Sequence, residues 1–517
     1  MRRGSVVGAA AGIAGVTVLA RVVGFGRVAV LTRTLGTGCV GDAYQSANQL
    51  PNVVFEIVAG GALASLVVPL LAGAVASGDR ERAGRTASAL LTWTVLILTP
   101  VAALGGLLAL VRALAGAHPA CGQPLLEVGA RMLQVFMPQV VLYGIGIVLT
   151  GVLQAHRRFL GPALAPLLSS LVVITAYLLY AVQGPGELAS LSSAQELTLS
   201  VGTTLGVAVL ALPLLVPLRG CGLVLRPTLT FPSGIAGRAR GLAAAGVAGL
   251  TAQQLALLVA LRLANGGEPG DIVVFFVATA VFLLPWAVLA VPLATSAFPV
   301  LSEHAEAGDR DGYLAQARTS LRGVLVVTIG AAAVLAAVAA PAARVLALGT
   351  RGVDRVAALS DATVAFAPGL VGYGLLALLA RAFYARGDGR TPAVATVTGW
   401  GVVAAADLGL VRLDLPRVVA LGLGNTIGMT VAGALLLVGL VRAVGPALLV
   451  GMVRTVAVCG GLAVPVVVGG RLVDGAVGRS VVGSAVVGAA VALVAGAAYL
   501  AGVRALDPAG LRALSRG

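Results

Sequence analysis

The sequence contains no lysine, and all 35 of its basic residues are arginine. Because a Walker A phosphate loop requires a lysine, the chain cannot hydrolyse ATP by that route. Charged residues of both signs make up only 11% of the chain, against roughly 25% in soluble domains. With 59% hydrophobic residues and a mean hydropathy of +1.01, the chain carries more apolar surface than a soluble core can bury. Its solvent must therefore be a lipid bilayer.

Cysteine and histidine are also scarce, with four and three copies in 517 residues. None of them stands at a spacing typical of metal ligands, and no nucleophile–base pair is recognisable. We therefore predict no metal site and a protein that is not an enzyme. Cys39 and Cys121 both fall near the predicted outer face of the membrane. A disulfide between them is one interpretation, and two unrelated thiols is the interpretation that the sequence favours.

The apolar runs predict an all-α polytopic membrane protein. A backbone that spans a bilayer must be helical or form a closed barrel, and barrel strands alternate apolar and polar residues over about ten positions. Here the runs stay apolar over about 20 residues or more, which is the length of a spanning helix. We predict fourteen spans, at 5–31, 42–76, 86–111, 127–153, 160–181, 196–217, 238–262, 271–300, 318–340, 356–385, 392–411, 416–441, 448–469 and 480–503.

The arginines predict the orientation in the cytoplasmic membrane. Those in the predicted inner loops outnumber those in the outer loops by about two to one when both termini are cytoplasmic. The outer loop 344–355 departs from this rule. Because the net charge of +15 is spread over short loops instead of one patch, it does not indicate nucleic-acid binding. The apolar run after Met1 is too long for a cleavable signal, so we expect it to remain as the first span.

An internal repeat with an offset of 230 residues organises the chain. The triplet Gly78-Asp79-Arg80 recurs as Gly308-Asp309-Arg310, Tyr143-Gly144 recurs as Tyr373-Gly374, and three prolines recur at the same offset: Pro69, Pro138 and Pro162, as Pro299, Pro368 and Pro392. Six predicted spans separate the copies, so the two halves keep the same orientation in the membrane. We predict a six-helix bundle over 1–220, a second over 221–445, and two additional spans with a cytoplasmic tail over 446–517.

Parallel six-helix repeats are typical of alternating-access transporters, whose substrate site lies between the halves. The predicted loops are too short to hold a soluble catalytic domain, and a channel more often shows a repeated filter or a ring of like charges. We therefore rank a transporter above a channel or a membrane enzyme. The substrate site should be marked by ionisable residues that lie deep in the membrane.

Three arginines of the first span lie at different depths. Counted from Ser5, Arg21 lies about 24 Å, Arg27 about 33 Å and Arg33 about 42 Å along the helix, against a hydrocarbon core of about 30 Å. Arg33 is interpreted as an anchor that reaches the outer surface. Arg27 is either an anchor or a site residue. Arg21 is embedded, and we predict that it binds substrate.

Acidic residues supply the next candidates. Glu56, in the second span, can pair with Arg21 or Arg27, and it is a candidate substrate-binding residue. Asp407 lies near the outer end of the eleventh span, where it is either an interfacial residue or a site for a coupling ion. No cofactor is expected apart from Na⁺ or H⁺ as that coupling ion, which Glu56 or Asp407 can bind.

Two further positions complete the predicted site. Asp42 stands at the outer start of the second span and is interpreted as a helix N-cap. Glu127 and Arg131 are four residues apart, which predicts an ion pair on one helix face, and Arg131 can also face the cavity. A positively charged cavity suits an anionic amphiphile, because the planar fork of arginine matches phosphate and the lipid tail can stay in the membrane.

Several stretches carry a family resemblance. They resemble the MurJ/MviN family of lipid II flippases of peptidoglycan synthesis, in an actinobacterial-type variant, within the multidrug/oligosaccharidyl-lipid/polysaccharide exporter superfamily. The stretches are "ARVVGFGR" (20–27), "GDAYQSANQLPNVVFEIVAGGALASLVVPLL" (41–71), "LPWAVLAVPLATSAFPVLSEHA" (284–305) and "RAFYARGDGRTP" (381–392). The resemblance covers essentially the whole chain. It implies that undecaprenyl-pyrophosphate-linked disaccharide-pentapeptide is flipped from the inner to the outer leaflet by alternating access.

The resemblance also implies roles for particular residues. Arg21 and Arg27 match the two first-helix arginines that line the family's central cavity, and Asp42 matches an acidic position at the start of helix two. The chain departs from the family at Phe55-Glu56, where many members have adjacent arginines. It departs again at Thr279-Ala280 and Leu283, where many members have an Asp-Arg…Glu set.

Two alternative functions stay open at this point. One is an exporter of another lipid-linked glycan or of a drug in the same superfamily. The other is a non-transporting membrane scaffold for cell-wall synthesis proteins, which are also the possible protein partners of a flippase. The sequence leaves membrane potential, Na⁺ and H⁺ open as the driving force.

Overall fold

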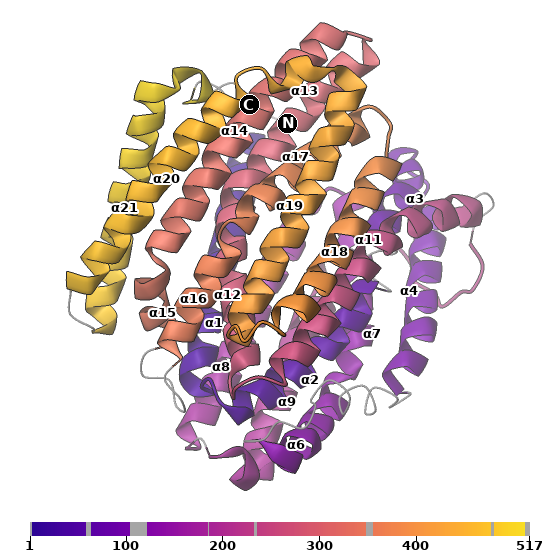
Figure 1. Cartoon of the computed structure of the whole chain (residues 1–517). Helices are drawn as coiled ribbons and strands as arrows, with labels where there is room; N and C mark the ends of the chain where they lie inside the picture. The colour runs from indigo at the N-terminus through magenta and orange to yellow at the C-terminus, as the bar shows by residue number, and fades with distance from the viewer. Residues whose placement is uncertain are drawn as a thin grey trace. The chain divides into compact units, whose positions relative to one another are not determined.

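The computed structural model describes residues 3–57, 64–103, 121–184, 186–231, 235–347, 355–476 and 480–511. These residues form helices joined by turns and loops, without strands (Figure 1), which confirms the all-α prediction. Within them, 11 helices are long and apolar enough to cross a membrane, or up to 12 if the bent pair Val356–Phe366 and Gly369–Ala385 is one span. In the described ranges, each predicted span coincides with one helix or with consecutive helices. The number of spans that meet the length and apolarity expected of a membrane helix is lower than fourteen, so the predicted count is approximate.

The chain divides into two compact units. The first contains the described residues up to Gln254 together with Glu268–Ile272, and the second contains Leu255–Gly267 and the other described residues from Val273 onward. Two helices therefore pass from one unit into the other along the chain. They are α11 (Ile235–Ala264) and α12 (Asp271–Pro285).

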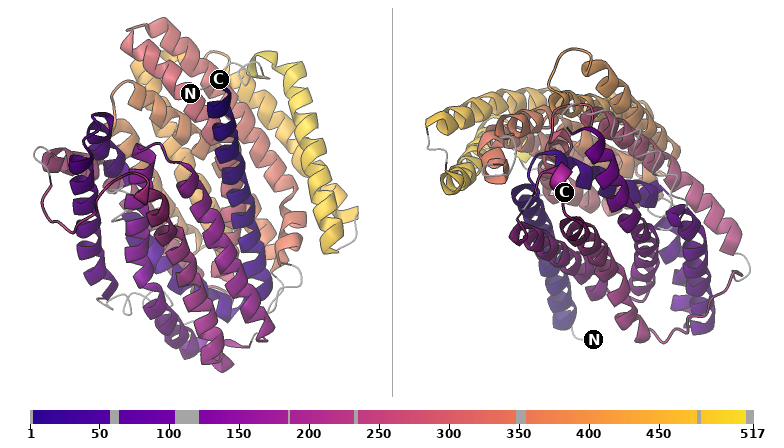
Figure 2. Two further views of the ribbon diagram at one scale, coloured as in Figure 1. Left: turned by 180° about the vertical axis from the view of Figure 1, so that it is seen from behind. Right: turned by 90° about the horizontal axis from the view of Figure 1, so that it is seen from below.

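In the first unit α1 packs against α8, and α8 packs against α9 (Figure 2). The helix α7 is the central element, because it contacts α3, α4 and α9. The elements of this unit are α1 (Arg3–Thr34), α2 (Cys39–Phe55), α3 (Ala64–Ala76), α4 (Arg80–Ala103), α6 (Gly122–Phe136), α7 (Pro138–Ala155), α8 (Leu160–Val182), η2 (Leu188–Ser190), α9 (Ser193–Ala211), η3 (Leu212–Leu214) and α10 (Leu215–Arg219).

The second unit repeats these contacts, since α17 packs against α13, α14 and α19, and α18 packs against α19. Its last two helices, α20 and α21, pack against each other and against α14. The elements are the π-helical turn η4 (Trp286–Ala290), α13 (Val291–Glu306), α14 (Arg310–Ala337), α15 (Ala339–Ala347), α16 (Val356–Phe366), α17 (Gly369–Ala385), α18 (Arg390–Leu410), α19 (Arg417–Val444), η5 (Pro446–Leu449), α20 (Met452–Ala476) and α21 (Val481–Leu506).

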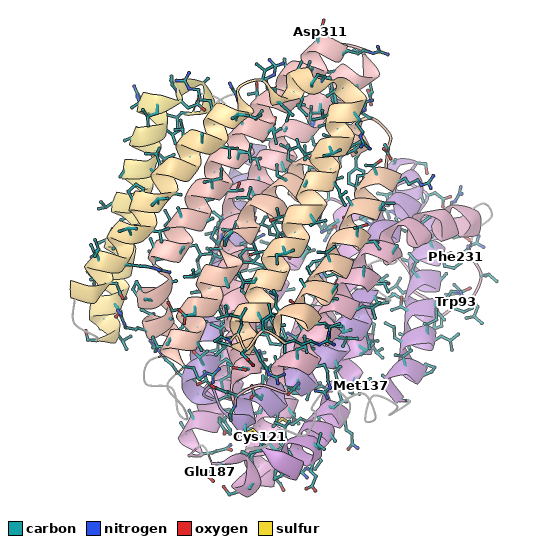
Figure 3. The ribbon with its side chains drawn as sticks, in the orientation of Figure 1. Trp93, Cys121, Met137, Glu187, Phe231 and Asp311 are labelled. Atoms are coloured by element: carbon teal, nitrogen blue, oxygen red, sulfur yellow. A yellow bond between two sulfur atoms is a disulfide. The ribbon has the colours of Figure 1, made fainter. Side chains whose placement is uncertain are left out.

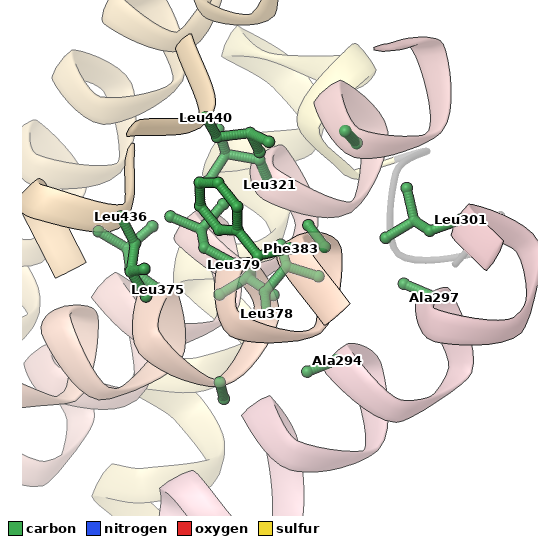
Figure 4. Packing of buried hydrophobic residues seen from close by; sticks show 14 of the residues in the cluster. Ala294, Ala297, Leu301, Leu321, Leu375, Leu378, Leu379, Phe383, Leu436 and Leu440 are labelled. Carbon is green, nitrogen blue, oxygen red and sulfur yellow. The ribbon is translucent and has the colours of Figure 1, made fainter. Parts of the chain in front are cut away.

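The packing of α17 centres on a cluster of buried aliphatic side chains (Figure 4). Leu375, Leu378 and Leu379 of α17 lie against Leu321 of α14 and Leu436 of α19, and Ala294 and Ala297 of α13 belong to the same cluster. A buried leucine of this kind contributes roughly 1.5–3 kcal/mol relative to an exposed one in water. Because lipid removes much of this hydrophobic term, close van der Waals packing holds these helices together.

The repeated Gly-Asp-Arg triplets form the same turn in both units. Gly78 and Gly308 have φ values of 70° and 68° and end the preceding helix. Asp79 and Asp309 then cap the following helix, each through an Oδ1 that accepts a backbone N–H at 2.9 Å. The Gly312 N–H, followed by the His304 side chain, holds the pKa of the Asp309 carboxyl below its ordinary value. The repeat read from the sequence is therefore a repeat of local structure.

A second repeated turn differs between the units in one informative residue. The turn between α17 and α18 has Gly387 in the left-handed region, at φ 75°. At the equivalent position between α7 and α8 the chain has Arg157, at φ 57°. The left-handed conformation costs a residue other than glycine about 1–2 kcal/mol. The first unit therefore holds an arginine where the backbone favours glycine.

Cys39 and Cys121 are joined by a disulfide, with their Cα atoms 5.6 Å apart (Figure 3). The interpretation that the sequence favoured, two unrelated thiols, is wrong for the structure. Cys39 is the first residue of α2, Cys121 immediately precedes α6, and these two helices pack against each other. The packing brings the two helix starts together across 82 residues of sequence, and spacing alone does not reveal that.

We predict that non-reduced, denatured protein contains two titratable thiols, Cys221 and Cys459, and that reduction raises the number to four. Replacing both Cys39 and Cys121 by serine should lower the thermal midpoint in detergent, because a disulfide contributes about 2–5 kcal/mol. Thiol titration and thermal denaturation check these outcomes. The matched control is Cys221→Ala, which removes an unbridged thiol, and an equal loss of stability in that variant would contradict the assignment.

Candidate functional site

Of Arg21, Arg27 and Arg33 on α1, Arg27 is the one that lies beside a buried network of tyrosine hydroxyls. Arg21 and Arg33 are exposed, whereas Arg27 is half-buried. Arg27 lies within electrostatic range of the hydroxyl groups of Tyr44 and Tyr143. Because the field of a cation stabilises nearby acceptor oxygens and anions, this end of the first unit can hold negative charge.

The Tyr44 hydroxyl is fully buried and belongs to a chain of hydrogen bonds. It pairs with the Tyr177 hydroxyl and with Thr203 Oγ1, each at 2.8 Å. Thr203 in turn donates to the Leu199 carbonyl oxygen. The Tyr177 hydroxyl also lies within electrostatic range of Arg27. These contacts fix α2, α8 and α9 relative to one another. They therefore hold the tyrosine hydroxyls in place near Arg27.

Glu56 lies beside Tyr143 instead of pairing with an arginine. The Phe55 ring packs on the Tyr143 ring with centroids 4.7 Å apart, and the chain enters π-helical geometry at Glu56. Glu56 is half-buried and within electrostatic range of Tyr143. Within the described residues it forms no ion pair with Arg21 or Arg27, so the predicted pair is wrong for this structure. The Phe55–Tyr143 contact directs this end of α2 to α7.

Asp42 is a buried structural contact and not the predicted N-cap. The helix α2 begins three residues earlier, at Cys39, with Gly38 as its N-cap. The side chain of Asp42 is only 3% exposed, and its Oδ2 accepts the backbone N–H of Gly270 at 2.6 Å. The carboxylate therefore ties the start of α2 to the segment Glu268–Ile272, which belongs to the same unit.

Arg131 is paired, but with a different acid from the one predicted. Its Nε and Nη2 atoms donate to both carboxylate oxygens of Glu196, at 2.9–3.1 Å. Glu127 lies within electrostatic range but makes no ion-pair contact among the described residues. Glu196 is buried in the first turn of α9, and among the described residues its ion-pair partner is Arg131. The spacing rule missed this pair because the two residues are 65 positions apart.

Asp407 lies in the second unit, on α18, and is only 1% exposed. Its carboxylate is therefore enclosed by protein. The carboxylate packs against Gly424 of α19, where a side chain would overlap it. Its Oδ1 has no hydrogen-bond partner within the part of the chain that the structure describes. A buried carboxylate oxygen without a partner is unfavourable, which makes Asp407 a candidate for protonation or for binding a cation.

Tyr143 enters the sequence prediction only as a landmark of the repeat, although the structure places it within electrostatic range of both Arg27 and Glu56. The repeat carries a signal for it, because its counterpart Tyr373 is likewise paired with an aromatic ring, that of Trp286 in the π-helical turn η4. There the Trp286 Nε1 donates to the Tyr373 carbonyl oxygen at 3.3 Å, and the two rings are 5.8 Å apart.

The described residues contain no group of three or more His, Cys, Asp or Glu side chains that is able to hold a metal ion. The site geometry therefore rests on arginine, tyrosine and single carboxylates. Guanidinium groups and hydroxyls of this kind are able to donate hydrogen bonds to an anion.

Comparison with known proteins places these features in a family. The family model described as lipid II flippase MurJ matches residues 31–487. A relative from Rhizobium meliloti is 25% identical over 427 residues, covering 80% of this chain and 76% of that protein. The "Lipid II flippase MurJ" of Burkholderia cenocepacia is 26% identical over 389 residues, covering 74% and 73%.

A solved structure titled "Lipid II flippase MurJ, inward closed conformation" shares the fold with a TM-score of 0.74 at 17% identity. The match covers 95% of this chain and 98% of that chain. With eleven to twelve long apolar helices in its described part, this chain is an integral membrane protein. Since the family model spans most of its length, the chain belongs to the lipid II flippase MurJ family.

Proposed function

We propose that this chain flips lipid II, an undecaprenyl-pyrophosphate-linked disaccharide-pentapeptide, from the inner to the outer leaflet of the bacterial cytoplasmic membrane. Transport proceeds by alternating access of the two predicted six-helix bundles, 1–220 and 221–445, without a covalent step. Family membership supports the substrate. The observation that carries the proposal is the half-buried Arg27 beside the hydroxyls of Tyr44, Tyr143 and Tyr177.

The pyrophosphate is the part of the substrate that these residues recognise. Arg21 and Arg27 are its proposed contacts, because a guanidinium donates two parallel hydrogen bonds to a phosphate. Glu56, beside Tyr143, orients the site and repels an incorrectly placed anion. Asp42 and Arg131 act by holding helices in place, through Gly270 and Glu196, and Arg131 remains half-exposed for a contact with the head group.

The proposed orientation has both termini in the cytoplasm. Besides the excess of arginine in the inner loops, the Cys39–Cys121 disulfide supports it, because disulfides persist on the oxidising side of a bacterial membrane. This orientation places that disulfide at the outer face and the Gly-Asp-Arg turns at the inner face.

The direct experiment is depletion of the chain in its host, followed by measurement of the lipid II accessible at the outer leaflet. We expect outer-leaflet lipid II to fall while the inner pool rises. An unchanged outer pool would refute the flippase. Loss of a different lipid-linked glycan would identify the alternative exporter, and rescue by a transport-dead variant would identify a scaffold.

Arg27→Gln should reduce flipping tenfold or more, because a hydrogen bond to a charged group contributes about 1.5–3 kcal/mol and about 1.4 kcal/mol equals a factor of ten. Arg21→Gln should act in the same direction. The matched control is Arg33→Gln, on the same helix, which should keep normal flipping. Outer-leaflet lipid II in a depletion strain, at equal membrane levels of each variant, checks this. Full rescue by Arg27→Gln would remove Arg27 from the site.

The Arg131–Glu196 pair allows a separate test of structure against substrate binding. Arg131→Gln alone leaves Glu196 unpaired and should lower the thermal midpoint in detergent. The double variant Arg131→Gln, Glu196→Gln should regain stability, because both charges are removed and the two amides can hydrogen-bond. If Arg131 serves only to pair Glu196, the double variant also regains flipping. Flipping that stays low in a stable double variant assigns Arg131 to the substrate.

Asp407 is the proposed coupling site, for H⁺ or Na⁺. Its buried carboxylate with an unpartnered Oδ1 fits either a proton or a monovalent cation. Binding of either ion neutralises the carboxylate and so changes the charge of the site by one unit, and moving one unit charge across the membrane potential is worth about 2.3 kcal/mol per 100 mV. The carboxylate itself is held in place by the close approach of α19 at Gly424.

Asp407→Asn should make flipping in proteoliposomes insensitive to Na⁺ and to pH, because the amide binds neither ion at this position. Transport rates under imposed Na⁺ and pH gradients measure this. Asp361→Asn is the control, since Asp361 is an exposed carboxylate of α16 in the same unit. Retention of the wild-type ion dependence in Asp407→Asn would exclude Asp407 as the coupling residue.

A further inference from the structure

A groove of about 670 Å³ lies on the first unit, where the start of α8 meets η3 and α10. Its walls are apolar and exposed, with Leu160 at 55%, Leu168 at 41% and Val216 at 67% exposure. These residues belong to helices long and apolar enough to span the membrane. In a bilayer, the groove therefore faces lipid chains and not water.

One end of the groove is basic, because Arg157 and Arg158 line it together with the apolar walls. Arg158 donates to the carbonyl oxygens of Pro217 at 3.1 Å and Gly220 at 2.6 Å, so its guanidinium is used to hold α8 and α10 together. Arg157 is exposed, and the structure gives its guanidinium no hydrogen bond or ion pair within the described residues. One arginine is thus structural and the other is available to a ligand.

The backbone at Arg157 gives a second reason to assign a role to its side chain. Arg157 has φ 57°, a left-handed conformation that favours glycine, and the equivalent turn in the second unit has Gly387 there. In both units, glycine would therefore adopt this backbone conformation at a lower free-energy cost than arginine. A residue kept in an unfavourable conformation indicates a function for its side chain.

We propose that this groove binds an anionic phospholipid. The phosphate lies on the Arg157 guanidinium, and one acyl chain lies along Leu160, Leu164 and Leu168, which follow one face of α8 over about 12 Å. Basic pockets at the membrane surface bind acidic head groups, and the apolar walls inside the hydrocarbon region exclude a water-soluble partner. This site requires only that the protein is in a membrane, so it does not rest on the proposed flipping activity.

The test uses the full chain in detergent micelles, with phosphatidylglycerol and phosphatidylcholine as probes and native mass spectrometry as the readout. The wild type should retain phosphatidylglycerol in preference to phosphatidylcholine. Arg157→Gly should lose this preference by about fivefold, the factor expected for one arginine at an anionic surface, and Arg157→Lys should keep most of it. Leu168→Trp should reduce retention of both lipids, because the indole fills the groove.

The control variant is Arg390→Gln, which removes an exposed arginine at the repeat-equivalent position of Leu160, at the start of α18. It should leave lipid binding unchanged. Arg157→Gly should also keep or raise the thermal midpoint, because glycine suits the backbone at this turn. A destabilised Arg157→Gly would show that the side chain is structural and overturn the proposal. Equal retention of the two lipids by the wild type, or retention of undecaprenyl pyrophosphate but not phosphatidylglycerol, would overturn it as well.

Discussion

The need to match every charge inside a low-dielectric bilayer governs this structure. An ionisable group in the hydrocarbon region is tolerated only when it is paired, neutralised or solvated. The buried Glu196 meets Arg131, and Arg344 of α15 meets Asp474 of α20 through a bidentate contact. Asp407 and Arg27 are different, because neither has an ion-pair partner within the described residues. A counter-charge that binds beside such a group gains free energy, which is why the proposed substrate and ion sites are placed at these two residues.

The two copies of the internal repeat share their helix packing, and they differ in the residues that stand at equivalent positions. Both units pair the repeated tyrosine, Tyr143 or Tyr373, with an aromatic ring at or directly before a π-helical turn, Phe55 in the first unit and Trp286 in the second. In the first unit that turn begins with the acidic Glu56, whereas in the second unit it begins with Trp286 and the surroundings are aromatic. The aromatic pairing is therefore shared, whereas Tyr143 also lies within electrostatic range of Arg27 and Glu56, the charges on which the proposed pyrophosphate site depends.

The helices and the repeat are predictable from the sequence because both depend on local composition. A run of about 20 apolar residues is a helix in a membrane whatever lies beside it, and Asp309 caps its helix by a contact three residues away. Prediction from the sequence failed where a contact joins distant segments. Arg131 was assigned to Glu127, its neighbour by helical spacing, but binds Glu196, and the helix packing that joins Cys39 to Cys121 has no signature in the spacing of the cysteines. Asp42 was misread for a local reason, since α2 begins three residues before the expected position.

The structure also accounts for part of the one region that opposed the arginine rule. Arg344 lies in the predicted outer loop 344–355, yet its guanidinium is held by both carboxylate oxygens of Asp474 and its side chain is only 16% exposed. An arginine that is buried and paired with a carboxylate has less influence on the orientation of the chain in the membrane than a free arginine has. Arg355 is similarly buried, at 5% exposure, while Arg351 lies outside the described residues. With Arg344 removed from the outer count, the remaining arginines favour the proposed orientation with cytoplasmic termini more strongly.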